Sequence, residues 1–209
     1  MGGSGVSAVI FDIGNVLVHV STTKGIMPRV VEKLGIEGGS TAERIVRSDI
    51  YSRYATGGIS TREFYDEVRE AEGLDLGYDE FNRIRGEIFS PVEGMGELVA
   101  EIARAGRVRL GLLSDTDEVH WGHLRRDHAV FAHFARPTLS FEIGRMKPDP
   151  ECYCAAARNT GAPVGECFFV DDLERNVEGA RAAGMAAVRF VGAGGVGKLR
   201  EELIACRAL

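Results

Sequence analysis

Three short apolar runs of the sequence end in polar side chains that could take part in catalysis. One carboxylate ends the first run, a hydroxyl and a carboxylate end the second, two carboxylates end the third, and a lysine precedes a predicted helix: Asp12, Ser114, Asp115, Asp171, Asp172 and Lys147. Ligands of open parallel sheets bind beyond the carboxyl ends of the strands, so these side chains are expected at one edge of a sheet. Carboxylates that lie close together repel unless they share a cation, and their hard oxygen atoms suit Mg²⁺.

The chemistry that this set predicts is phosphoryl transfer. A hydroxyl and a lysine beside the carboxylates suit a phosphate group, because both donate hydrogen bonds to anionic oxygens. A carboxylate aimed at a metal-bound phosphoryl group can attack phosphorus and form an aspartyl phosphate. Each residue alone also has an ordinary interpretation: Asp12 as a turn cap, Ser114 and Asp115 as a loop pair, and Lys147 as a solvated side chain. The adjacent acids Asp171 and Asp172 fit such an interpretation least, because their repulsion costs stability unless a cation or a capping role offsets it.

The elements that would position these residues alternate as in an α/β protein with a parallel sheet. Each strand candidate is short and apolar, as expected of strands that are covered on both faces. The strand candidates are Val6–Phe11, Val108–Leu113, Cys167–Val170 and Ala187–Val191. The helix candidates are Gly94–Ala105, Glu118–Arg126, Pro150–Thr160, Val177–Ala183 and Gly197–Ala205.

One stretch, from about residue 21 to residue 90, interrupts this alternation. It has no strong strand signal, and two segments in it, starting at Ser40 and Ser60, fit the capping box that begins a helix. We expect a small all-helical cap over residues 21–90, inserted into a core made of residues 1–20 and 91–209.

The four segments, in this order, resemble the four motifs of the haloacid dehalogenase superfamily, and the resemblance covers nearly the whole chain. It implies a Rossmann-like core with a helical cap, at the position where residues 21–90 are inserted. It also implies a catalytic role for each segment: Asp12 as nucleophile, Ser114 as phosphate-binding hydroxyl, Lys147 as the motif lysine, and Asp171 and Asp172 as the acidic pair.

The first motif, Phe-Asp-x-Gly-Asn-Val, is similar to that of phosphatases resembling α-D-glucose-1-phosphate phosphatase. Most phosphatases of the superfamily carry a second aspartate two residues after the nucleophile, where this chain has Gly14. The family binds its metal through the backbone carbonyl at that position, so the resemblance implies Mg²⁺ ligands from Asp12, Gly14 and Asp172, with Asp171 in support. This chain departs from the family's pattern because Gly14 has no side chain that could transfer a proton to the leaving group. Asp115 and His19 are the candidates to replace it, and both, with Ser114 and Lys147, are candidates to bind substrate.

Composition narrows the class of protein further. The chain has 209 residues, of which 44% are hydrophobic and 27% charged, which is the globular range. A net charge of −6 argues against nucleic acid as a partner. No apolar run reaches the roughly 20 residues that span a bilayer. Four cysteines without a signal-peptide pattern at Met1–Gly5 lead us to expect reduced thiols and a cytoplasmic location.

The functional hypothesis is a Mg²⁺-dependent phosphatase acting on a small phosphorylated metabolite, such as a sugar phosphate. A catalytically weak relative that binds a phosphometabolite or a partner protein is the alternative, because of Gly14. A 2-haloacid dehalogenase needs no metal, so Asp171 and Asp172 argue against it. Two further patterns are given ordinary interpretations: Gly192–Lys198 lacks the Ser/Thr of a P-loop, and His120 and His123 are read as part of a polar helix face rather than a metal site.

Overall fold

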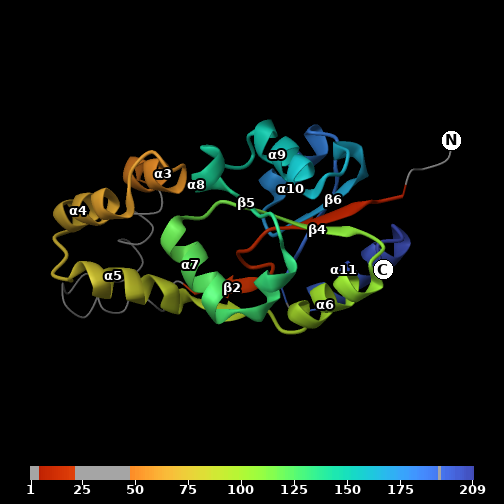
Figure 1. The fold of residues 1–209 in the computed structure, drawn as a ribbon, viewed down its shortest axis with the longest axis horizontal. Helices are drawn as coiled ribbons and strands as arrows, with labels where there is room; N and C mark the ends of the chain where they lie inside the picture. The colour runs from red at the N-terminus through yellow and green to blue at the C-terminus, as the bar shows by residue number, and fades with distance from the viewer. Residues whose placement is uncertain (1–4, 22–47, 193) are drawn as a thin grey trace.

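The computed structural model describes residues 5–21, 48–192 and 194–209. A parallel sheet lies between helices, and a second group of helices lies to one side of it (Figure 1). The strands are β1 (Ala8–Phe11), β2 (Val18–Val20), β3 (Phe89–Pro91), β4 (Arg109–Ser114), β5 (Thr138–Leu139), β6 (Cys167–Asp171) and β7 (Ala186–Arg189). The helices are α3 (Asp49–Ala55), α4 (Thr61–Glu72), α5 (Tyr78–Arg85), α6 (Met95–Ala105), α7 (Glu118–Asp127), α8 (Ser140–Ile143), α9 (Pro150–Thr160), α10 (Glu174–Ala182) and α11 (Gly195–Ala205), with short 3-10 helices η1 (Gly86–Ile88), η2 (Ala129–His133) and η3 (Val164–Glu166).

The main sheet has five parallel strands in the order β5-β4-β1-β6-β7. In this register Phe11 lies opposite Leu112 of β4 and Val170 of β6. The residues that follow these three positions therefore reach the same edge of the sheet. The predicted α/β class with a parallel sheet is confirmed.

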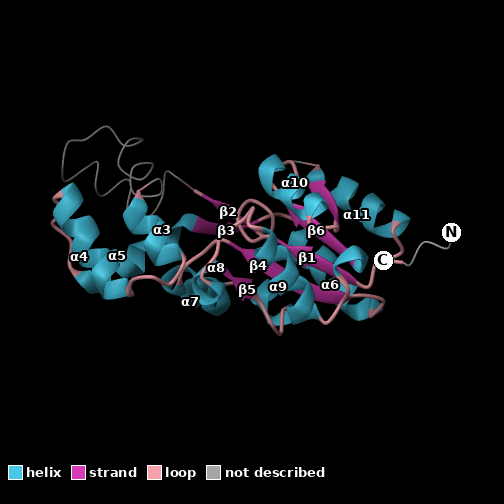
Figure 2. Ribbon diagram, turned by 90° about the horizontal axis from the view of Figure 1, so that it is seen from above, coloured by secondary structure: helices cyan, strands magenta, loops and turns pink. Residues whose placement is uncertain are grey.

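The strands are apolar throughout because helices cover both faces of the sheet (Figure 2). Ala8 and Ile10 of β1 pack into a cluster with residues of α9 and α10, whereas Val9 and Phe11 pack into a cluster with residues of α6 and α11. All four β1 side chains are completely buried. Successive side chains of a strand point to opposite faces, so β1 joins the two halves of the core.

All four predicted strands and all five predicted helices are present, with ends shifted by a few residues. Strands β2, β3 and β5 are not predicted by the sequence, and each has only two or three residues. The expectation that residues 21–90 contain no strand was wrong at its end, because β3 begins at Phe89 and pairs antiparallel with β2. Such short strands are stabilised by pairing with a strand that is distant in the sequence, so their own few residues give little indication of strand structure.

Helices α3, α4 and α5 lie between β2 and β3 in the chain and form a separate helical group, here called the helical insertion (residues 49–85). The predicted capping box at Ser60 is confirmed: Ser60 Oγ accepts from the Glu63 amide, and the Glu63 carboxylate accepts from the Ser60 amide. The insertion has its own buried aromatic cluster, which includes Tyr54, Phe64 and Phe81. The capping box expected at Ser40 lies outside the described residues. None of the described helices combines the length and the apolar character that a membrane span requires.

Candidate active site

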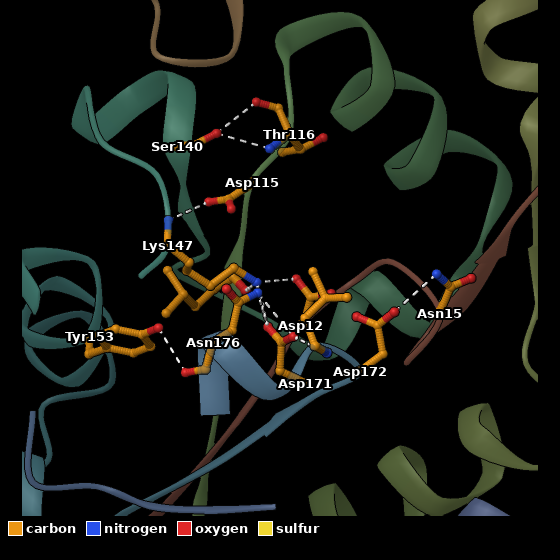
Figure 3. Close-up of polar contacts among 12 residues, drawn as sticks. Asp12, Asn15, Asp115, Thr116, Ser140, Lys147, Tyr153, Asp171, Asp172 and Asn176 are labelled. Atoms are coloured by element: carbon orange, nitrogen blue, oxygen red, sulfur yellow. Dashed lines mark hydrogen bonds and ion pairs between the residues drawn. The ribbon is translucent and has the colours of Figure 1, made fainter. Parts of the chain in front are cut away.

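Lys147 joins two of the carboxylates that the sequence analysis singled out (Figure 3). Its Nζ atom donates to Asp12 Oδ1 at 2.6 Å and to Asp171 Oδ2 at 2.7 Å. The Asp12 amide donates to the Val170 carbonyl, which extends the pairing of β1 and β6 to the nucleophile candidate itself. Lys147 arrives from the loop before α9, so three segments far apart in the sequence meet at this edge.

Burial governs the electrostatics of this group. Burial raises the pKa of Asp12 to about 6, with Lys147 opposing the rise and Asp171 adding to it. For Lys147 burial alone would lower the pKa, but Asp12, Asp171 and Asp115 together raise it far above its usual value. Lys147 therefore stays protonated at neutral pH, as a fixed positive charge beside Asp12.

Asp171 is held so completely that its oxygens have little capacity left. Besides the Lys147 bond, its Oδ1 accepts from the Leu173 amide at 2.8 Å, and Asn176 Nδ2 donates to both carboxylate oxygens at 3.1 Å. Tyr153 Oη in turn donates to the Asn176 carbonyl at 2.8 Å, which fixes the start of α10 against α9. A fully buried carboxylate with these partners suits the supporting role expected for Asp171.

Asp172 is the more accessible member of the acidic pair. Its side chain is half-buried, and its Oδ2 accepts from Asn15 Nδ2 at 3.1 Å. Burial raises the pKa of Asp172, and the Asn15 hydrogen bond opposes this rise. Asp172 therefore presents a carboxylate near Asp12 that forms no ion pair with any residue in the described part of the chain.

The acidic group as a whole suits a divalent cation, with Asp171 in support of Asp12 and Asp172. One oxygen from each of Asp12, Asp171 and Asp172 lies within 4.8 Å of the others, and among the described residues this is the one such group of metal-binding side chains. Lys147 supplies a single positive charge against three carboxylates, which leaves a surplus of negative charge on hard oxygen donors. Such a donor set favours Mg²⁺ over softer metals.

The loop after β4 carries the remaining candidates. Ser114 ends β4 and is buried. Asp115 Oδ1 accepts from the Lys147 backbone amide at 2.9 Å, so this carboxylate orients the lysine loop. Next to it, Ser140 Oγ accepts from the Thr116 amide and donates to the Thr116 carbonyl, both at 2.9 Å. The loop is thus held in place on its core side.

The positions of Gly14 and His19 bear on the missing proton-transfer group. A Cβ atom at Gly14 would lie 3.8 Å from Asp12 Oδ2 and 3.4 Å from the Val20 side chain. His19 is exposed on β2, and because side chains alternate along a strand, it points away from the face on which Val20 meets Gly14. Its assignment to substrate binding stays a prediction.

The two histidines of α7 have partners other than a metal. His120 Nδ1 lies 2.9 Å from Asp117, and His123 Nε2 lies 3.0 Å from the Asn82 carbonyl. Both side chains are mostly buried, at 15% and 14% exposed, so they do not lie on an open polar helix face as expected. Four further residues of the site and its surroundings are not predicted from the sequence: Asn15, Ser140, Tyr153 and Asp117. Two of them carry a signal, because Asn15 stands in the first motif and Asp117 has the residue type and place of a helix N-cap.

The chain is similar in sequence and in fold to several known proteins. A family model described as haloacid dehalogenase-like hydrolase matches residues 6–184. A phosphatase of Mycobacterium tuberculosis, MT3486, is 29% identical over 190 residues, which cover 87% of this chain and 86% of the relative. The D-ribitol-5-phosphate phosphatase of Bacteroides thetaiotaomicron is 23% identical over 180 residues, covering 81% and 84%. A crystal structure of a family enzyme from Bacteroides thetaiotaomicron, in complex with magnesium and inorganic phosphate, superposes with a TM-score of 0.77 at 23% identity, covering 90% of this chain and 96% of that one.

Proposed function

The chain belongs to the haloacid dehalogenase-like hydrolases, and we propose that it is a Mg²⁺-dependent phosphatase that hydrolyses a small phosphorylated metabolite. The observation that carries this proposal is the arrangement around Lys147, which holds Asp12 and Asp171 while Asp172 stands beside them. The phosphatase relatives support the reaction class.

In the proposed reaction Asp12 is the nucleophile. Its carboxylate attacks phosphorus in line with the leaving oxygen, a new P–O bond forms to Asp12, and the bond to the leaving group breaks. Lys147 and the Ser114 hydroxyl donate hydrogen bonds to the phosphoryl oxygens and stabilise the charge that they carry. Water then hydrolyses the aspartyl phosphate and restores the Asp12 carboxylate.

The proposed metal site is formed by the same group of carboxylates. Asp12, Asp172 and the backbone carbonyl of Gly14 would hold Mg²⁺, and Asp171 would keep Lys147 and the acidic pair in place. When bound, Mg²⁺ supplies positive charge that polarises the phosphoryl group. The hydrogen bond from Asn15 to Asp172 would fix the direction of this ligand.

The helical insertion is proposed as part of a cap, over residues 21–90, that selects the leaving group. A sugar phosphate or polyol phosphate is the first substrate class to test, since one relative is a D-ribitol-5-phosphate phosphatase. A weakly active or ligand-binding protein is the second candidate, because Gly14 lacks the carboxylate that would protonate the leaving group.

The deciding experiment measures phosphate release from p-nitrophenyl phosphate and from a panel of sugar and polyol phosphates, with Mg²⁺ and with EDTA. Asp12→Asn should lower turnover by several orders of magnitude, since the covalent path is lost. Asp66→Asn, at an exposed aspartate of α4, is the matched control and should leave turnover unchanged. Retention of more than roughly a tenth of wild-type turnover in Asp12→Asn would exclude this nucleophile. Halide release from a chloroacid without metal would favour a dehalogenase.

A further inference from the structure

A buried ion pair joins the helical insertion to the core. Arg85, the last residue of α5, donates from Nη2 to Asp117 Oδ2 at 2.5 Å. The Arg85 side chain is 5% exposed and that of Asp117 is completely buried. Asp117 stands just before α7, three residues after Ser114. The pair therefore connects the insertion to the loop that bears the candidate phosphate-binding hydroxyl.

The insertion holds the Arg85 guanidinium from several sides. Its central carbon lies 5.2 Å, 5.0 Å and 5.8 Å from the ring centroids of Tyr54, Phe64 and Phe81, which belong to α3, α4 and α5. Such cation–π contacts are stronger where the cation is desolvated, as it is here. The direction of Arg85 thus depends on how all three helices pack against one another.

Asp117, which pairs with Arg85, also binds the first turn of α7. Its Oδ1 accepts from the His120 amide at 3.0 Å, which caps the helix, and its Oδ2 lies 2.9 Å from His120 Nδ1. Burial alone would raise the pKa of Asp117, but Arg85 and His120 hold it well below its usual value. The carboxylate stays ionised, so its position depends on keeping Arg85 as a partner.

Three successive residues of the loop after β4 each have a different hydrogen-bond partner. Asp115 is held by the Lys147 amide and Thr116 by Ser140, both from the core, whereas Asp117 is held by Arg85 from the insertion. Other described contacts between the insertion and α7 are weaker in kind: Thr61 Oγ1 lies 3.3 Å from an exposed Glu118 carboxylate, and His123 reaches the Asn82 carbonyl. Arg85 provides the buried charged contact of this interface.

We propose that Arg85 is a positioning residue: acting through Asp117, it transmits the packing of the helical insertion to the loop that carries Ser114 and Asp115. The inference rests on the proposed function only in treating Ser114 as a phosphate ligand. It deepens that function, because a change in the insertion on substrate binding would move the phosphate-binding loop through this pair.

The experiment compares Arg85→Met, which keeps an unbranched side chain against the three rings, with Arg85→Lys, which keeps the charge. Arg83→Met, at an exposed arginine of the same helix that pairs with Glu87, is the matched control. The double variant Arg85→Met/Asp117→Asn removes both charges, so it keeps the test open if Arg85→Met alone does not fold. Two quantities are measured: hydrogen exchange of amides 114–120, without ligand, and inhibition by inorganic phosphate in the presence of Mg²⁺.

In Arg85→Met and in the double variant, we expect amides 114–120 to exchange at least about tenfold faster, while amides of β6 and α9 keep their rates. The inhibition constant for phosphate should rise about tenfold, because the Ser114 loop is displaced. Arg85→Lys should recover part of both effects, and Arg83→Met should show neither. If amides 114–120 of the double variant exchanged at the wild-type rate, the proposal would be overturned. If the wild type neither hydrolyses nor binds phosphate, the proposed function fails, and hydrogen exchange still decides whether Arg85 holds the loop.

Discussion

Asn15 connects the candidate metal ligand Asp172 to β2, the strand that pairs antiparallel with β3. Its Nδ2 donates to Asp172 Oδ2 at 3.1 Å, and its Oδ1 accepts from the Val20 amide of β2 at 3.2 Å. Asn15 has a φ of 54°, in the left-handed region that asparagine tolerates better than most residues. The Asn15 side chain therefore contacts both β2 and the acidic pair, from the turn that follows the candidate nucleophile.

The first prediction concerns this side chain. Asn15→Gly keeps the left-handed backbone without strain but removes both hydrogen bonds. We expect the Mg²⁺ affinity to fall about 10- to 100-fold, as for other groups that orient a ligand, while turnover at saturating Mg²⁺ changes little. Calorimetric Mg²⁺ binding and a Mg²⁺ titration of activity measure the two effects. Arg207→Gly, at the other described non-glycine residue with positive φ, is the control and should bind Mg²⁺ as the wild type does.

The second prediction separates the two acids of the pair. Asp172→Ala should raise the Mg²⁺ requirement sharply with little loss of fold, because its carboxylate is half-buried and Asn15 is its one side-chain donor among the described residues. Asp171→Ala should instead destabilise the metal-free protein by about 3–5 kcal/mol, because Lys147 loses a buried partner. Urea unfolding in EDTA and Mg²⁺ titrations distinguish the two outcomes. Full activity at saturating EDTA would contradict the metal assignment for both residues.

The third prediction is a pH dependence of stability at Asp12. Its pKa rises on folding from the ordinary 3.8 to about 6, chiefly through burial. A carboxyl with a raised pKa binds its proton more tightly when folded, so this contribution is fully present below about pH 4 and is lost as the pH rises through about 6. Asp12→Asn cannot ionise. In EDTA it should therefore match the wild type near pH 4 and be more stable by roughly 3 kcal/mol near pH 7.5.

Urea unfolding of both proteins across this pH range measures the difference, with Asp66→Asn as the control for an amide at an exposed site. A constant difference between Asp12→Asn and the wild type would mean that Asp12 does not carry the raised pKa. Added Mg²⁺ should reduce the advantage of Asp12→Asn near pH 7.5, because a ligand that binds the native wild type more tightly than the native variant stabilises the wild type more.

Patterns local in sequence led to the sheet and to the acidic edge. Asp12 follows β1, Ser114 and Asp171 are the last residues of β4 and β6, and parallel pairing brings these strand ends together. The contacts that hold the site were not predictable in this way. Arg85 and Asp117 are 32 residues apart in the sequence. From the sequence alone, an arginine at a helix end resembles an ordinary surface residue, and only the fold shows that aromatic rings such as that of Phe64 surround it. The partner of Asn15 is likewise 157 residues away, and no local periodicity indicates it.

The space at Gly14 makes the missing acid testable. Its φ lies outside the left-handed region, so a side chain there meets no backbone strain, and a Cβ would make only ordinary contact with Val20 at 3.4 Å. Asp12 Oδ2 would be 3.8 Å from that Cβ, which brings a carboxylate at position 14 to the reacting group. General acid catalysis is typically worth about 10²–10⁴-fold, and it matters most for leaving groups that depart poorly.

The last prediction is that Gly14→Asp raises turnover of a sugar phosphate by about tenfold or more relative to its effect on p-nitrophenyl phosphate. An alkoxide leaving group needs a proton as the P–O bond breaks, whereas nitrophenolate leaves without one near neutral pH. Gly14→Asn is the matched control: it fills the same space but cannot transfer a proton, so it should show no such preference. An equal change for both substrates in Gly14→Asp would mean that another group already supplies the proton. The same panel with Asp115→Asn and His19→Gln then identifies that group, because the variant that loses it should lose sugar phosphate turnover selectively.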